Sequence, residues 1–122
     1  MATNKTRIPW PPSKLNPNKR YGQQWRAVQG TKLKYNLEAK VCFQSDAITP
    51  PDGWAGGIRV TFHLPNNRGR DVDNLLASIK GALDQLSKFI GVDDKDFWFD
   101  KITKTYDPNR IGFVEIELVL GD

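Results

Sequence analysis

Two aspartates separated by one residue lie beside two arginines in the segment Asn66-Asn67-Arg68-Gly69-Arg70-Asp71-Val72-Asp73-Asn74. Carboxylate oxygens are preferred ligands of Mg²⁺ and Mn²⁺, and arginine binds phosphate groups in a bidentate manner. A divalent ion on Asp71 and Asp73, with Arg68 and Arg70 nearby, would suit the hydrolysis of a phosphodiester.

The start of a helix must position this pair. In residues 72–90, apolar side chains recur every three or four residues, which predicts one amphipathic helix that ends at Gly91. Residues two apart within a helix point about 200° away from each other, so Asp71 and Asp73 can converge only if Asp71 lies at or before the N-cap. Ordinary capping, which needs no metal, is the alternative role for the two aspartates.

A second acidic group, Asp93-Asp94-Lys95-Asp96, follows the predicted helix. Three or four carboxylates packed together favour a bound cation. The alternative is a run of acidic residues on the surface that is solvated and binds no ion. A helix of about 18 residues is about 27 Å long and would hold this group far from Asp71 and Asp73. Either the segment after Gly91 folds back, or two copies related by a two-fold axis share their sites, with antiparallel helices.

Positive charge is concentrated at the start of the chain. The first 40 residues contain nine lysines and arginines and one acidic residue. Residues 41–122 contain nine lysines and arginines and thirteen acidic residues. Such a basic arm favours a polyanionic partner, because lysine and arginine release counterions when they bind nucleic-acid phosphates. Lys14, Lys19 and Arg20 are therefore candidate contacts with DNA, and a solubilising tail is the alternative.

The length of 122 residues predicts a single domain, 1–122, with one hydrophobic core. Cys42 is the only cysteine, so an internal disulfide is excluded and a structural zinc site is not expected. The sequence has neither an apolar run long enough for a membrane span nor a signal peptide, which predicts a cytoplasmic protein without a membrane partner.

Strand patterns occupy both halves of the chain. Residues 58–64 alternate as in a half-buried strand, and residues 97–106 and 112–120 predict an antiparallel hairpin joined at Asp107-Pro108-Asn109-Arg110. The proline-rich residues 7–13 can form an edge strand at most, and residues 14–30 predict an irregular arm. Residues 31–46 alternate as in a strand, although Leu33, Leu37 and Val41 also lie at helical spacing. The pattern predicts an α+β fold, with a small mixed or antiparallel sheet of about four strands packed on helices.

Four motifs follow one another along the chain: Trp10-Pro11-Pro12-Ser13, the strand that ends in a basic loop, Arg70-Asp71-Val72-Asp73-Asn74-Leu75 at the start of a helix, and Val92-Asp93-Asp94 before a strand. Together they resemble the RusA family of Holliday-junction resolvases. The resemblance covers nearly the whole chain. It implies an α+β homodimer that nicks opposed strands of four-way DNA junctions with Mg²⁺ held by three aspartates, here Asp71, Asp73 and Asp94. It also implies that residues 31–46 are helical, and we adopt that prediction over the alternation.

Two features depart from the family pattern. The family usually has a catalytic lysine one helical turn after the second aspartate, where this chain has Ala77, and Lys80 could replace it only by reaching back toward the start of the helix. The segment before Asp94 is also slightly longer, which leaves Asp93 or Asp96 as alternative third ligands.

The leading hypothesis is a crossover-junction endonuclease, with Lys80, Arg68 or Arg70 stabilising charge on the phosphate. A nuclease for other branched DNA and a catalytically silent DNA-binding relative are the alternatives.

Overall fold

Four segments with alternating apolar residues form one mixed sheet with the strand order β1-β4-β2-β3. The computed structural model describes residues 3–16 and 25–121. In it, β4 pairs antiparallel with both β1 and β2, whereas β3 pairs parallel with β2. The strands are β1 (Lys5–Pro9), β2 (Gly57–Leu64), β3 (Trp98–Tyr106) and β4 (Phe113–Val119).

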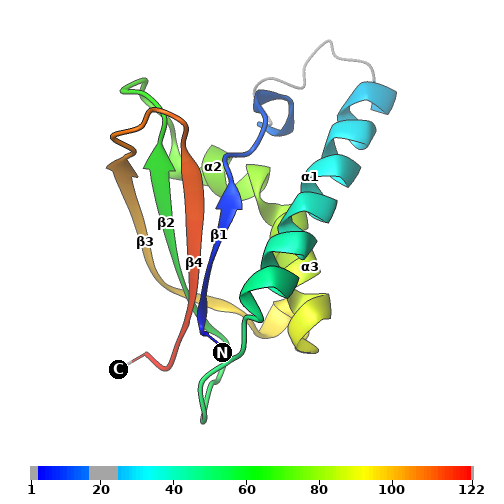
Figure 1. The fold of residues 1–122 in the computed structure, drawn as a ribbon, viewed down its shortest axis with the longest axis vertical. Helices are drawn as coiled ribbons and strands as arrows, with labels where there is room; N and C mark the ends of the chain where they lie inside the picture. The colour runs from blue at the N-terminus through cyan, green and yellow to red at the C-terminus, as the bar shows by residue number, and fades with distance from the viewer. Residues whose placement is uncertain (1–2, 17–24, 122) are drawn as a thin grey trace.

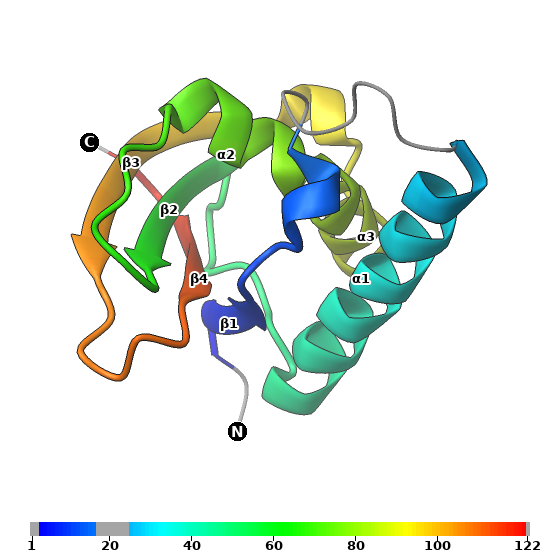
Figure 2. The same ribbon diagram turned by 90° about the horizontal axis from the view of Figure 1, so that it is seen from above.

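The helices pack on one face of this sheet, as Figures 1 and 2 show. Buried side chains from the strands and helices form one hydrophobic core between the two layers. The predicted α+β class and the sheet of about four strands are confirmed. The helices are α1 (Trp25–Asp46), α2 (Val72–Ser78) and α3 (Lys80–Ile90), with the short 3₁₀ turns η1 (Ser13–Leu15) and η3 (Asp94–Asp96).

The proline-rich segment enters the sheet and leaves it quickly. It forms β1 at one edge, as predicted, and the strand ends at Pro9. The hydroxyl of Tyr35 on α1 donates a hydrogen bond of 2.6 Å to the carbonyl oxygen of Pro9. This bond ties α1 to the point where the segment leaves the sheet.

The predicted hairpin of the last two strands is wrong, because β2 lies between β3 and β4. The backbone N–H of Asp107, just after β3, donates to the carbonyl oxygen of Leu64 at the end of β2. The Asp107 carboxylate accepts hydrogen bonds from the backbone N–H groups of Gly112, Asn109 and Ile111, which hold its pKa below the usual value. The turn therefore carries the chain past the end of β2 instead of back along β3.

Residues 31–46 are helical, so the prediction adopted from the family resemblance is confirmed and the strand interpretation is wrong. Alternating apolar residues of α1 lie on opposite faces, because residues two apart on a helix are about 200° apart. The residues that face the core are Tyr35, Ala39 and Phe43, and the exposed ones are Leu33, Leu37 and Val41. The helix begins at Trp25, so the last part of the predicted irregular arm, residues 25–30, is helical as well.

The predicted helix over residues 72–90 is interrupted at Ile79, which separates α2 from α3. Ile79 has φ −105° and ψ 8°, and its N–H donates to the carbonyl oxygen of Leu76, three residues back. The Ile79 side chain is fully buried in the core. Gly91 ends α3 with a left-handed conformation, φ 74°, as predicted.

Substitutions on the two faces of α1 should have different effects on stability. We expect Phe43→Ala to lower the free energy of unfolding by about 3–5 kcal/mol, because it leaves a cavity in the core. Val41→Ala should change that free energy by no more than about 0.5 kcal/mol, because the Val41 side chain is exposed. Urea denaturation followed by circular dichroism would measure both, and equal losses would contradict the assignment of the two faces.

Candidate metal and DNA-binding site

The first residues of α2 carry the two central aspartates. Asp71 is the N-cap residue, with an extended backbone at φ −76° and ψ 136°, and Asp73 lies in the first turn. This geometry meets the condition for the two carboxylates to converge. The Asp71 side chain makes no capping hydrogen bond to any described N–H of α2, and both aspartates are exposed. Capping therefore does not account for Asp71.

The basic loop before α2 is held by hydrogen bonds. The side-chain oxygen of Asn66 accepts from the backbone N–H of Arg68 at 3.1 Å and from the Arg70 guanidinium at 2.9 Å. From the neighbouring strand β3, the ammonium group of Lys104 donates to the carbonyl oxygen of Arg70 at 2.9 Å. Both contacts restrict the backbone just before Asp71.

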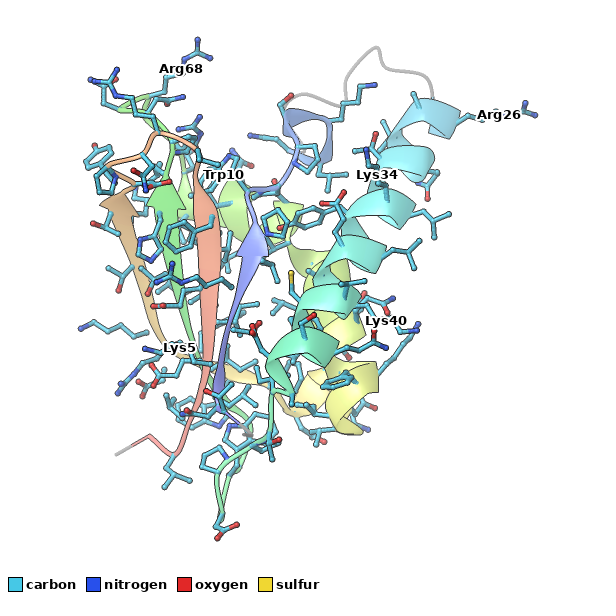
Figure 3. All side chains as sticks on the ribbon, viewed as in Figure 1. Lys5, Trp10, Arg26, Lys34, Lys40 and Arg68 are labelled. Carbon is cyan, nitrogen blue, oxygen red and sulfur yellow. The ribbon has the colours of Figure 1, made fainter. Side chains whose placement is uncertain are left out.

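The two arginines of this loop differ in their surroundings. The Arg70 guanidinium lies 5.4 Å from the centre of the Trp10 ring, and partial burial together with Arg68 lowers its pKa. Arginine nevertheless stays charged in proteins. Arg68 is exposed, and Figure 3 shows it beyond the ends of the strands, pointing away from the fold. Across residues 3–16 and 25–121, neither arginine forms an ion pair with an aspartate of α2.

A cavity of about 590 Å³ joins the basic loop to the proline-rich segment. Its walls combine two cations with an indole ring and proline rings, so it offers charge and flat apolar surface to a ligand. The two segments lie far apart in the sequence, and no local pattern indicates that they meet. The lining residues are Trp10, Pro11, Pro12, Ser13, Asn16, Pro65, Arg68, Gly69, Arg70, Leu75, Ser78 and Ile111.

Asp94 lies at the opposite end of the sheet from Asp71 and Asp73. The α2 aspartates follow the end of β2, whereas η3 leads into the start of β3, and these two strands are parallel. Figure 1 shows η3, the short yellow turn before β3, and α2 at opposite ends. The eight residues of β2 alone span roughly 25 Å. The alternative that the segment after Gly91 folds back onto the pair is therefore wrong.

The acidic group at η3 has a local structural role. The Asp93 carboxylate accepts a hydrogen bond from the backbone N–H of Lys95 and lies 3.9 Å from its ammonium group. Asp94 and Asp96 are exposed. In the described parts of one chain, no three His, Cys, Asp or Glu side chains gather closely enough to hold a metal ion. The described part of one chain thus offers the Asp71 and Asp73 carboxylates without a third.

Lys80 and Ala77 line the same cavity, of about 410 Å³, between α1 and the junction of α2 with α3. Ala77 lies one helical turn after Asp73 and on the same face of α2. A second lysine, Lys32 of α1, also lines this cavity, together with Asp84. The sequence does not indicate Lys32 as a site residue, because no local pattern shows that α1 approaches this junction.

The remaining predicted DNA contacts are only partly described. Lys14 is exposed in η1, close along the chain to the proline-rich segment. Lys19 and Arg20 lie outside the described residues.

Comparisons with known proteins add no assignment to this geometry. The sequence matches no model of a known protein family and no curated protein sequence. Among the described helices, none is both long enough and apolar enough to cross a membrane.

Proposed function

We propose that this protein is a metal-dependent DNA endonuclease that cleaves four-way junctions, the activity of the RusA family that its motifs resemble. The observation that carries the proposal is the exposed pair of carboxylates at the start of α2, directly after a basic loop. Within the described residues, neither Asp71 nor Asp73 is neutralised by the arginines beside it. Unneutralised carboxylates beside a phosphate-binding loop suit a cation that bridges protein and DNA.

Asp71 and Asp73 fit Mg²⁺ or Mn²⁺, because they supply hard oxygen ligands and leave coordination positions for water and a phosphate oxygen. When bound there, such an ion would act as a Lewis acid on the scissile phosphate and make water a stronger nucleophile. The chain itself orients the two carboxylates through the N-cap geometry of Asp71 and the anchored loop before it.

Phosphate contacts would come from the loop and the arm. Asn66 and Trp10 hold Arg70 in place, so it is suited to a defined contact near the cleavage point. Arg68 projects into solvent and can follow the backbone of a bound strand. Lys14, Lys19 and Arg20 would add contacts that are independent of DNA sequence.

The RusA family has a lysine at the position where this chain has Ala77. Lys80, together with Lys32 in the same cavity, would supply that positive charge here. A positive charge near the cleaved phosphate stabilises the charge that develops in the transition state. The break at Ile79 supports this role, because it places Lys80 at the start of α3, beside the cavity that Ala77 lines.

We also infer a homodimer in which Asp94 reaches the α2 pair of the other copy, because it cannot do so in its own chain. A two-fold axis that sets two sheets antiparallel would bring the start of β3 in one copy to the end of β2 in the other. Each dimer would then contain two equivalent sites, as paired nicks require.

Cleavage of a synthetic four-way junction tests the proposed activity directly. We expect nicks in opposed strands, and we expect this cleavage to require Mg²⁺ or Mn²⁺. Asp73→Asn should abolish cleavage but not junction binding, because the substitution removes a metal ligand and leaves the basic loop intact. Gel analysis against linear duplex and a flap would measure both cleavage and binding. Preference for the flap would indicate another branched-DNA nuclease, and binding without cleavage by the parent would indicate a silent relative.

Lys80 can be tested in the same assay. We expect Lys80→Gln to slow cleavage by about 10²- to 10³-fold, the range for loss of one group that stabilises developing charge, with little change in junction affinity. Lys88→Gln is the matched control, because Lys88 is an exposed lysine near the other end of α3. Equal effects of the two substitutions would mean that Lys80 contributes only general positive charge.

Mixing two inactive variants tests whether the sites are shared. If Asp94 acts in the other copy, a heterodimer of Asp73→Asn with Asp94→Asn contains one intact site and one that lacks both aspartates. We therefore expect the mixture to regain nicking at one strand, measured after subunit exchange. No recovery, with mixed dimers demonstrated by native mass spectrometry, would place the third ligand elsewhere.

A further inference from the structure

Helix α1 has a second apolar face, and this face is exposed in the described structure. Leu33, Leu37 and Val41 are 63%, 53% and 58% exposed, although each is a large aliphatic residue. They follow one another at four-residue spacing and form one row along the helix, here called the outer row. Three aligned exposed aliphatic residues differ from the scattered single ones that are normal on protein surfaces.

The outer row lies opposite the residues that hold α1 in place. Phe43 and Ala39 are fully buried against the sheet and α3, and the hydroxyl of Tyr35 bonds to Pro9. Within the described residues, the helix is therefore anchored by side chains that lie outside the outer row. A rigid helix that carries an unused apolar row is a prepared surface for a second helix, whose side chains can fill the spaces along the row.

Positive charges flank the outer row. Lys34 and Lys40 lie about 60° on either side of Leu37 around the helix axis, and Arg26 continues the row toward the start of α1. All three are exposed, and Figure 3 shows them spaced along the length of α1. Glu38 is exposed beside Leu37, and at the other end of the row Asp46 lines a cavity with Val41, together with Lys5 and Arg7. The surface is thus apolar along its centre and mainly basic at its margins.

We propose that the outer row binds an amphipathic helix of another protein whose apolar face is bordered by acidic residues. Aliphatic residues of that helix would pack on Leu37 and its neighbours, and its carboxylates would pair with Lys34 and Lys40. The inference does not rest on nuclease activity and concerns a face separate from the candidate site.

A second copy of this chain fits the outer row less well. Two such rows facing each other would bring three cations from each copy together against one Glu38 from each, and like charges across an interface are unfavourable. An anionic membrane also fits poorly, because the apolar surface is one residue wide and interfacial helices use a broader face. Charge and width together favour an acidic helix.

A pair of labelled synthetic peptides would test this inference. Both are amphipathic helices of about 18 residues with the same leucine face, one bordered by glutamates and the other by lysines. We expect the full-length protein to bind the glutamate peptide at least tenfold more tightly, as measured by fluorescence anisotropy. Leu37→Glu should weaken that binding at least tenfold, and the double variant Lys34→Glu, Lys40→Glu should reverse the preference.

Leu120→Glu is the matched control, because Leu120 is 55% exposed beside the end of β4 and not on α1. It should leave peptide binding unchanged, and unfolding in urea should confirm that every variant folds. The proposal is overturned if both peptides bind equally, if neither binds, or if Leu37→Glu has no effect. Self-association in analytical ultracentrifugation that Leu37→Glu abolishes would assign the surface to a second copy. Binding to phosphatidylglycerol vesicles in place of the peptide would assign it to a membrane.

Discussion

The parallel pairing of β2 with β3 determines most of the arrangement. Two parallel strands that follow one another in the chain need a connection that returns from the end of the first to the start of the second. Here α2, α3 and η3 make that return, and they cover one face of the sheet as they do so. The aspartates at the start of the connection and those at its end are consequently held at opposite ends of the same two strands.

The candidate site is built where this connection begins. Backbone and side-chain hydrogen bonds from Asn66 and Lys104 hold the loop before α2, and the indole of Trp10 lies against Arg70. One residue of the loop itself and two distant parts of the chain, at Trp10 and Lys104, therefore support this short segment. Among the described residues, no lysine or arginine forms an ion pair with Asp71 or Asp73, which is the basis for proposing a bound cation there.

Helix α1 shows how one pattern can be consistent with two structures. Alternating apolar residues are typical of a strand, but the same alternation on a helix makes two opposite apolar faces. Only one of those faces is buried in this fold, by the sheet and α3. The family resemblance led to the correct assignment of residues 31–46 as a helix. The pattern alone favoured a strand, because a helix with this pattern must leave one row of apolar side chains exposed to solvent.

From the sequence alone we could predict the α+β class, the edge position of the proline-rich strand, the strand at β2 and the placement of Asp71 at a helix start. These features depend on local preferences: missing N–H groups in proline, alternation, and side chains near a helix terminus. Tertiary packing was needed to show that β2 separates β3 from β4, that the long helix breaks at the buried Ile79, and that Asp94 lies far from Asp71. It also brought Lys32 to the cavity beside Ala77. These outcomes depend on contacts between segments far apart in the chain, and a local pattern does not specify which partner a strand or helix will meet.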